Sequence, residues 1–236
     1  MLKWLLMQSK KGAMPVNKLV KTSELFECNT MYLSELFNRY EFPWEILPNI
    51  KSYIYGLIES GIEGFTELSD GVYVGENVKI YPTAVIEGPA IIGAGTEIRP
   101  GAFIRGSVIT GANCVIGNSS ELKNCILLEK VQVPHYNYVG DSILGNKAHM
   151  GAGSICSNLK SDGKEVVIHS TTNIETGLRK VGAILADGAD VGCGCVLNPG
   201  TVIGKNTSVY PLNAIRGVFA ADSIIKSQNN VVERRK

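Results

Sequence analysis

The chain has 236 residues, of which 44% are hydrophobic and 26 are glycine, and its 23 basic and 22 acidic residues leave a net charge of +1. This length allows one large or two modest domains, and the composition is typical of a turn-rich β protein rather than a disordered one. Because the charges balance, nothing favours nucleic-acid binding. The apolar run at residues 1–7 is too short for a secretion signal or a membrane span, so we expect a cytoplasmic protein.

Residues 1–69 lack the repeat that follows and are predicted to form a separate helical region. Thr30 could cap one helix, and Pro48 could open another that stops at Gly61. The predicted inward positions are Leu33, Leu36 and Phe37 in the first helix and Ile50, Tyr53, Ile54, Leu57 and Ile58 in the second. We expect this region to cap one end of the β structure, where an open strand edge would otherwise pair with another chain.

Residues 70–222 carry an aliphatic residue at every sixth position. The series includes Val74, Ile80, Ile86, Ile92, Ile98 and Ile104, breaks at Thr110, continues through Ile116, Leu122 and Leu128, and returns from Leu185 to Ile215. Six residues are three strand alternations and do not fit a helix, so the spacing predicts a β solenoid. Glycines directly after the repeat position are expected to supply conformational freedom at the bends. Residues 223–236 are predicted to form a terminal strand and a charged tail.

Two irregularities interrupt the repeat. Val139 and Leu144 are five residues apart, and a slip of one residue must be absorbed by a loop or bulge because it would turn later side chains to the other face. The polar stretch 157–182 leaves the repeat around a short predicted strand at 166–169. Loops on a rigid scaffold often hold binding residues, so the irregular part is the predicted functional region.

The six cysteines are widely spaced and form no CxxC pair, which argues against a zinc ribbon and against a disulfide framework. Cys193 and Cys195 flank one glycine and could form a metal or redox pair. Cys195 falls on an inward position of the repeat, however, so packing in the core is the preferred interpretation.

The chain contains three histidines, His135, His149 and His169, and the first two bracket the register slip. Imidazole is the usual side chain for taking up a proton near neutral pH. A single histidine is more often structural, so the residues around His135 decide between the two interpretations.

Those residues resemble a known family. The segments RPGA at 99–102, IGNSSELK at 116–123, PHYNYVGDSILG at 134–145, GAGSICSN at 151–158 and GLRKVGA at 177–183 carry the resemblance. They are similar to the acetyltransferase domain of the bifunctional N-acetylglucosamine-1-phosphate uridyltransferase and glucosamine-1-phosphate acetyltransferase family, above all to its archaeal-type sugar-1-phosphate nucleotidylyltransferase/acetyltransferase members. The resemblance implies a left-handed parallel β-helix that forms a homotrimer with active sites between subunits.

The resemblance also implies roles for individual residues. His135 matches the general base, with Glu121 as the residue that orients it. Arg99 and Lys123 match the positions that hold the sugar phosphate, and Tyr138 and Lys164 match positions that contact the sugar. His149 stands at a further substrate position, where asparagine is usual in the family. Asn158 and the backbone of Ala152 match positions that contact acetyl-CoA, and no metal ligand is implied.

The function implied is that of a CoA-dependent N-acetyltransferase. It would move the acetyl group of acetyl-CoA to an amino-sugar 1-phosphate such as glucosamine-1-phosphate, a step of UDP-N-acetylglucosamine biosynthesis. Nothing before Gly61 resembles the glycine-rich loop LxAGxGTRM of the uridyltransferase domain, whose backbone would bind nucleotide phosphates, so uridyltransferase activity is not expected.

Two alternatives remain open. A zinc carbonic anhydrase can also use a left-handed β-helix trimer, but it needs three converging imidazoles, two of which come from positions five residues apart in that family. The histidines of this chain, at positions 135, 149 and 169, are spaced much more widely. The other alternative is a non-catalytic solenoid that binds a nucleotide sugar or a partner protein, in which case it would show no saturable affinity for acetyl-CoA.

Overall fold

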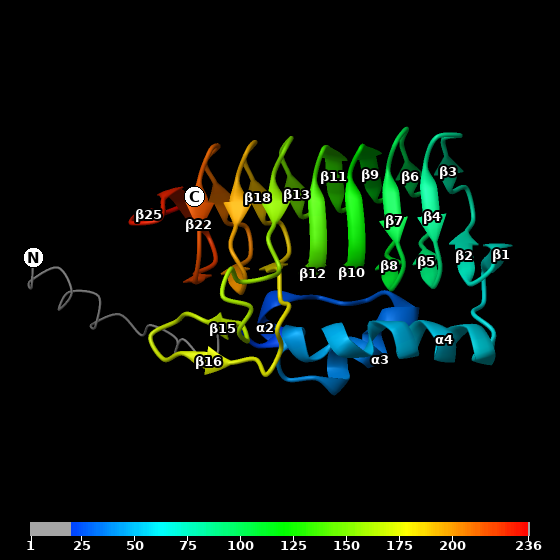
Figure 1. The fold of residues 1–236 in the computed structure, drawn as a ribbon, viewed down its shortest axis with the longest axis horizontal. Helices are drawn as coiled ribbons and strands as arrows, with labels where there is room; N and C mark the ends of the chain where they lie inside the picture. Colours follow the sequence, from blue (N-terminus) through cyan, green and yellow to red (C-terminus); the bar gives the residue numbers. More distant parts are fainter. Residues whose placement is uncertain (1–19, 236) are drawn as a thin grey trace, which may run out of the picture.

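A computed structural model describes residues 20–235, which form a three-sided solenoid of short parallel strands with helices along one side (Figure 1). In Figure 1 the near strands run downward and the far strands upward, while the chain advances from right to left. This winding is left-handed, as expected. The apolar run at residues 1–7 lies outside the described residues.

Each coil passes over three faces in turn. The first face holds β3 (Lys79–Ile80), β6 (Glu97–Ile98), β9 (Val115–Asn118), β11 (Gln132–His135), β13 (His149–Met150), β18 (Asp190–Val191), β21 (Ser208–Val209) and β24 (Ser223–Ser227). The second holds β4 (Val85–Glu87), β7 (Phe103–Arg105), β14 (Ile155–Cys156), β19 (Val196–Leu197) and β22 (Ala214–Ile215). The third holds β2 (Val72–Gly75), β5 (Ala90–Ile92), β8 (Val108–Thr110), β17 (Ala183–Leu185), β20 (Thr201–Ile203) and β23 (Val218–Phe219). Two longer strands, β10 (Glu121–Leu127) and β12 (Tyr138–Leu144), run from the second face onto the third.

The inward residues of the repeat stack into one continuous core. Ile98 pairs with Ile116, which pairs with Val133, and all three side chains are fully buried. Thr110 occupies an inward position as well, and its hydroxyl oxygen accepts a hydrogen bond from the Gly93 N–H at 2.9 Å. The break in the aliphatic series is therefore a buried polar residue with its hydrogen bond satisfied. Cys195 is buried, as expected, and Cys193 is exposed.

The glycines after the repeat positions serve the approach of neighbouring coils and not the bend. A Cβ atom on Gly93 would lie 2.3 Å from the Gly111 oxygen, and one on Gly117 would lie 1.6 Å from the Pro134 oxygen. Neither glycine has a positive φ. The left-handed backbone of the turns falls on other residues, such as Asn113 at φ 57° and Gly153 at φ 70°. The prediction that the glycines after the repeat positions supply conformational freedom at the bends was therefore wrong, because these glycines are needed where neighbouring coils approach closely.

The register slip begins one coil earlier than the sequence indicates. Leu122 pairs with Ile104 in the coil before it and with Val139 in the coil after it. The step from Leu122 to Val139 is one residue shorter than the step from Ile104 to Leu122. The inward residue that follows Leu122 is therefore Leu127, five residues on, and Leu128 packs in a second core outside the solenoid. Two neighbouring coils, those of β10 and β12, are each one residue short.

The helical region lies along the third face and does not cap an end. It comprises α2 (Thr22–Leu25), α3 (Met31–Arg39), the 3-10 helices η3 (Pro43–Glu45) and η4 (Leu47–Asn49), and α4 (Ile50–Ser60). Figure 1 shows α3 and α4 running parallel to the solenoid axis. The ends are closed instead by antiparallel strands, β1 (Phe65–Ser69) on β2 and β25 (Asn230–Glu233) on β24. The predicted end cap was wrong because the outward residues of the third face are themselves apolar.

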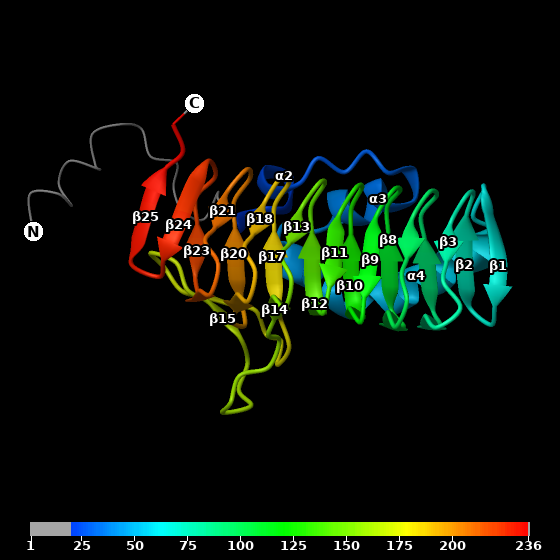
Figure 2. The same cartoon turned by 90° about the horizontal axis from the view of Figure 1, so that it is seen from above.

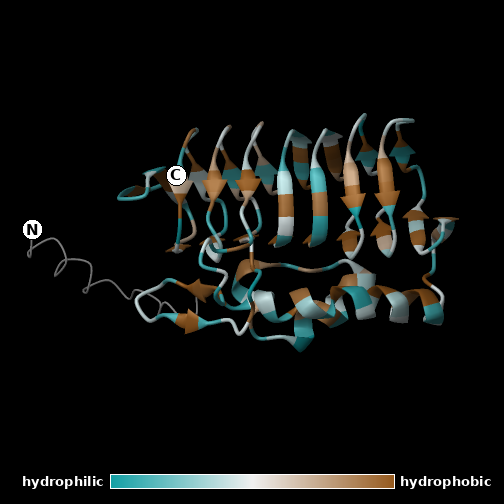
Figure 3. Ribbon diagram, in the orientation of Figure 1, coloured by the Kyte–Doolittle hydropathy of each residue, from teal (hydrophilic) through white to brown (hydrophobic). Residues whose placement is uncertain are grey.

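These outward residues form a second core with the helices. Ile91, Ile109, Ile126, Ile143 and Ile184 are fully buried and pack with Leu33, Leu36, Phe37, Ile50 and Ile54, which confirms the predicted inward faces of both helices. The hydropathy colouring of Figure 3 shows the apolar residues of the strands and of the helices. The cover continues with an excursion whose hairpin, β15 (Val167–Ile168) and β16 (Ile174–Glu175), contributes Ile168 to the same core.

Replacing Ile109 by alanine should destabilise the protein markedly. The side chain lies on β8 beneath α4 and is fully buried, so its loss leaves a cavity between the helical region and the solenoid. We expect a loss of about 2–5 kcal/mol in the free energy of unfolding, measured by urea denaturation. The control is Met31→Ala, because Met31 is 79% exposed at the start of α3 and should change stability by less than about 0.5 kcal/mol. Equal effects would contradict the assignment of a second core.

The third face is thus covered, whereas the first and second faces carry no helix within the described chain. The edge between them lies opposite the helices and forms the upper rim of the solenoid in Figure 1. The view from above in Figure 2 shows the strands on either side of this rim. No helix within residues 20–235 is long and apolar enough to cross a membrane.

Candidate active site

His135 ends β11 at the edge where the first face turns into the second, which we call the His135 edge. Tyr136 follows with a φ of 51°, a left-handed conformation that costs a bulky residue about 1–2 kcal/mol. Asn137, only 2% exposed, holds the turn. Its side-chain oxygen accepts the His135 N–H at 3.1 Å, and its amide donates to the Gly151 oxygen at 2.8 Å. His135 is exposed, and its ring makes no hydrogen bond within residues 20–235.

Ala152 occupies the same place one coil further along the His135 edge. The two coils are joined by a hydrogen bond from the Gly153 N–H to the His135 oxygen at 3.0 Å. Ala152 is exposed, and within the described residues its own N–H has no hydrogen-bond acceptor. The edge therefore presents an imidazole and, on the neighbouring coil, whose backbone lies at the usual strand spacing of about 4.8 Å, an unpaired backbone donor.

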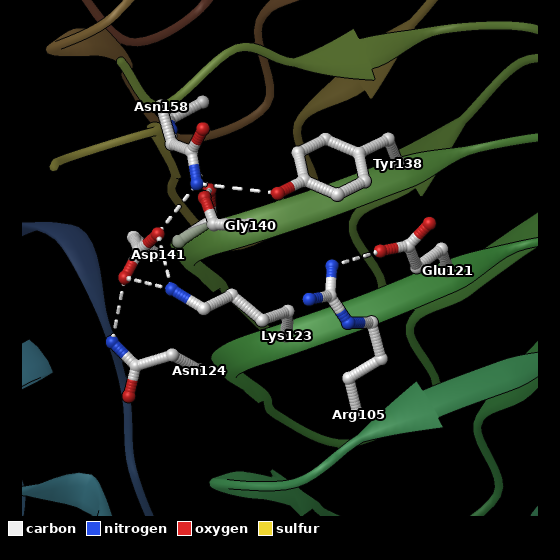
Figure 4. A network of polar contacts seen from close by, with 10 residues as sticks. Arg105, Glu121, Lys123, Asn124, Tyr138, Gly140, Asp141 and Asn158 are labelled. Atoms are coloured by element: carbon white, nitrogen blue, oxygen red, sulfur yellow. Dashed lines mark hydrogen bonds and ion pairs between the residues drawn. The ribbon is translucent and has the colours of Figure 1, made fainter.

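A buried carboxylate organises the opposite corner of the second face, shown in Figure 4. Asp141 is 4% exposed and accepts three sets of hydrogen bonds. The Lys123 ammonium lies 3.1 and 3.2 Å from its two oxygens, Asn124 donates at 2.8 Å, and the Asn158 amide donates as well. A buried charge is tolerated when it is paired and hydrogen-bonded in this way. Sequence reasoning assigned no role to Asp141, although it lies within the quoted PHYNYVGDSILG segment.

The short coils create this corner, which we call the Asp141 corner. In the preceding regular coil two residues make the turn, Gly106 at φ 76° and Ser107 at φ 53°. In the two short coils one residue does so, Asn124 at φ 48° and Asp141 at φ 46°, and these two stand opposite each other in the strand register. The excursion leaves the solenoid at the next coil, directly after Asn158. Loss of one residue in two successive coils thus stacks the groups that form the network.

Tyr138 connects the network to the His135 edge. Its ring folds back over Gly140, and its hydroxyl oxygen accepts a hydrogen bond from the Asn158 amide at 3.2 Å (Figure 4). Burial raises the pKa of the Tyr138 hydroxyl, and the nearby Asp141 carboxylate adds to the increase, whereas the Asn158 hydrogen bond opposes it. Tyr138 is therefore a neutral phenol near pH 7.

Gly140→Ala should displace both Tyr138 and Asn158. A Cβ atom at this position would lie 2.5 Å from the Tyr138 hydroxyl and 2.7 Å from the Asn158 amide nitrogen. We expect the acetyl-transfer activity proposed below to fall by at least about tenfold, because misplaced binding groups carry that cost. The fold should survive, since the tyrosine ring can swing outward. Gly56→Ala is the matched control, because Gly56 lies in α4 with open space around its Cβ position and no positive φ. Unchanged activity in Gly140→Ala would contradict the described position of Tyr138.

Arg105 is the functional candidate that sequence reasoning missed. It stands opposite Lys123 in the strand register, one coil before it, on the same outward column of the second face. Its guanidinium binds the Glu121 carboxylate at 2.7 Å. Glu121 is therefore engaged with Arg105, and the structure does not bring it to His135. The signal was present in the sequence, because Arg105 precedes Lys123 by the length of one regular coil, the step that also separates Ile104 from Leu122.

Arg99 lies on a different face from Lys123. It follows β6 on the first face and pairs with Glu97, with distances of 3.2 and 3.3 Å to one carboxylate oxygen. The chain needs six residues to cross one face of the solenoid, so Arg105, six residues after Arg99, lies on the second face and not on the first. The structure therefore places Lys123, Tyr138 and Asn158 together and leaves Arg99 outside their network.

His149 and Lys164 also lie apart from this network. His149 is on the first face, where its Nδ1 lies 2.8 Å from the Asp190 carboxylate of the next coil. Lys164 is exposed in the excursion, and its N–H donates to the Asp162 side chain at 3.1 Å. Figure 2 shows the excursion projecting away from the solenoid, and within residues 20–235 no hydrogen bond or ion pair joins Lys164 to the network.

The third histidine, His169, belongs to the hairpin of the excursion and contacts Asn173 and Arg216. Burial lowers the pKa of His169, and the charge of Arg216 lowers it further. Within residues 20–235 no three side chains of the metal-binding types come close enough to hold an ion. The described residues therefore offer no counterpart to the three-histidine site of the carbonic anhydrase alternative.

The comparisons with known proteins identify relatives that cover most of the chain. The model of the GMPPB C-terminal domain matches residues 86–181. Bifunctional protein GlmU of Methanococcus maripaludis is 31% identical over 224 residues, which cover 94% of this chain and 54% of that protein. A bifunctional sugar-1-phosphate nucleotidylyltransferase/acetyltransferase of Sulfurisphaera tokodaii is 36% identical over 97 residues, 41% of this chain and 24% of that protein.

Among solved structures, a mutant of AntD, an N-acyltransferase from Bacillus cereus in complex with dTDP and coenzyme A, matches with 17% identity and a TM-score of 0.41 over 74% of this chain and 92% of that chain. The chain spans about half the length of the GlmU proteins that it matches. The match to the GMPPB C-terminal domain and the match to the Methanococcus GlmU protein both run through the coils that hold His135 and Asp141, so this part of the chain is similar in sequence to both.

Proposed function

We propose that the protein is an acetyl-CoA-dependent N-acetyltransferase that acts on an amino sugar carrying a phosphate at C1. The observation that carries the proposal is the strip of polar groups across the second face. It begins at the imidazole of His135, passes Tyr138, and ends at Lys123 and Arg105. An amino sugar phosphate has matching groups, an amine at one side and a dianionic phosphate at the other.

His135 is the proposed general base. Its exposed ring would take a proton from the sugar ammonium, because a protonated amine has no electron pair with which to attack. The free amine attacks the thioester carbonyl and the C–S bond breaks. The proton on His135 passes to the departing CoA thiolate, and the acylated nitrogen releases its second proton to solvent as the neutral amide forms. The unpaired Ala152 N–H on the neighbouring coil would bind acetyl-CoA along the edge. Asn158 would hold Tyr138 against the substrate.

Arg105 and Lys123 are the proposed phosphate ligands. Their side chains leave neighbouring coils on one column, and cations at this spacing suit the oxygens of one phosphate. In the free protein each is balanced by a carboxylate, Arg105 by Glu121 and Lys123 by Asp141. This pairing keeps both side chains extended along the second face before a substrate arrives.

We also propose a homotrimer with the His135 edge facing a neighbouring subunit. Outward residues of successive coils on the second face stack in a column through Glu121, and apolar residues precede and follow Glu121 in it. Two of them are Val85, which is 53% exposed, and Ile155, which is 37% exposed. Phe103 and Val196 belong to the same column. A second copy would cover this column, and the projecting excursion would bring Lys164 to a neighbour. Light scattering should give the mass of three chains, and a monomer at working concentration would contradict this part of the proposal.

The direct test is release of free CoA thiol from acetyl-CoA. We expect turnover with glucosamine-1-phosphate and none with glucose-1-phosphate, which has the phosphate but no amine. Turnover with glucosamine that equals turnover with glucosamine-1-phosphate would contradict the phosphate subsite. No saturable binding of acetyl-CoA would contradict the enzymatic function as a whole and favour the scaffold alternative.

A further inference from the structure

A cavity opens on the other side of the Asp141 corner, between the helical region and the two segments that join the excursion to the solenoid, which we call the neck. Its volume is about 510 Å³, within the range of small-molecule sites. Asn124 and Asp141 form part of its wall, and Asp141 pairs with Lys123, so the cavity adjoins the polar strip of the second face through this ion pair. None of the roles assigned above uses this cavity.

The charges of the cavity favour an anion. Arg179 and Lys180 line it from the segment by which the excursion returns to the solenoid, and both are exposed. The Arg179 guanidinium donates one hydrogen bond, from Nε to the Gly163 oxygen at 3.0 Å, which leaves its other N–H groups available. The Lys180 ammonium has no partner within residues 20–235. The single carboxylate in the wall, that of Asp141, is already balanced by Lys123.

The remaining walls are apolar. Leu47 and Pro48 contribute from η4, and Leu159 and Leu178 from the two segments of the neck. Leu159 is 44% exposed and faces the cavity without a hydrophobic cover. The neck is held closed by a bridge between Leu159 and Lys180, so the cations and the apolar wall keep a fixed separation. A ligand that joins a flat apolar group to phosphate groups fits this combination of an apolar wall and two cations.

We propose that this cavity binds the nucleoside diphosphate part of a nucleotide-linked amino sugar. The diphosphate would pass round the Asp141 corner and join the sugar at C1. The base lies against Leu47, Leu159 and Leu178, and the outer phosphate lies at Lys180. The sugar and the inner phosphate remain on the second face, at Tyr138 and at Arg105 with Lys123. The proposal rests on the function proposed above and extends its acceptor from sugar phosphates to nucleotide-linked amino sugars.

The test measures equilibrium binding of UDP by calorimetry, which does not depend on acetyl transfer. We expect saturable binding to the whole chain that weakens at least tenfold in Lys180→Glu and in Leu159→Glu. Lys226→Ala is the matched control, because Lys226 is an exposed lysine at the C-terminal end of the first face and should leave UDP affinity unchanged. Circular dichroism of each variant checks that the neck has not unfolded.

Two further probes separate the sources of the anion. Inorganic phosphate should bind at least tenfold more weakly than UDP, because it cannot use the apolar wall. Coenzyme A should not displace UDP. The proposal is overturned if UDP does not bind, if Lys180→Glu leaves its affinity unchanged, or if coenzyme A displaces it and Lys180→Glu weakens coenzyme A binding. Loss of acetyl transfer with retained UDP binding would count against the proposed function alone.

Discussion

Replacement of His135 by alanine should lower kcat for acetyl transfer to glucosamine-1-phosphate by about 10²–10⁴-fold. This is the usual contribution of a positioned general base, and no other imidazole of the described chain lies on the His135 edge. The KM values for both substrates should change little, because the phosphate and the acetyl-CoA thioester are held by other groups. Stopped-time assays of CoA thiol release give kcat and KM separately.

The fold should survive this change. The His135 ring is exposed and makes no hydrogen bond within the described chain, and the turn is held by its backbone N–H and by Asn137. The matched control is His169→Gln, which removes an imidazole from the excursion hairpin and should leave kcat within about twofold. A His135→Ala variant that keeps kcat within threefold would show that the proton leaves the amine by another route.

Replacement of Arg105 by alanine should lower kcat/KM for glucosamine-1-phosphate by about 10–100-fold. Loss of a charge-assisted hydrogen bond to a phosphate costs about 1.5–3 kcal/mol, which corresponds to this range. The effect should fall mainly on KM, since the phosphate is far from the reacting carbonyl and contributes to substrate and transition state alike. Arg105→Lys should recover part of the loss because it restores the charge without the bidentate geometry.

Arg99→Ala is the control that separates the structural assignment from the sequence assignment. Both arginines are followed by a short turn and both pair with a glutamate, but Arg99 lies on the first face and Arg105 on the second. We expect Arg99→Ala to change kcat/KM by less than threefold. A loss larger in Arg99→Ala than in Arg105→Ala would place the phosphate on the first face and would restore the assignment made from the RPGA segment.

The sequence predicted the solenoid because its repeat is a local property of the chain. Inward residues such as Ile98, Ile116 and Val133 stack on their own equivalents, so spacing alone defines the coil. The position of the helical region was not predictable in the same way. It depends on the outward isoleucines of the third face, for example Ile109 and Ile126, which stand beside the inward positions and were read as part of the same strands.

The motifs correctly placed Lys123, Tyr138 and Asn158 close together, and the functional roles of these residues and of His135 stay predictions. Finding Arg105 required the length of a regular coil, the step from Ile104 to Leu122, which a motif alone does not contain. Asp141 was overlooked because its role depends on donors from different coils and turns, which only the folded chain brings together.

A crystal structure of the protein with coenzyme A and glucosamine-1-phosphate tests the central claim most directly. The account predicts the sugar nitrogen within about 3.2 Å of a His135 ring nitrogen and the phosphate on Arg105 and Lys123, in the groove along the His135 edge. A sugar phosphate bound at Arg99 on the first face, or a His135 ring turned away from both ligands, would contradict it.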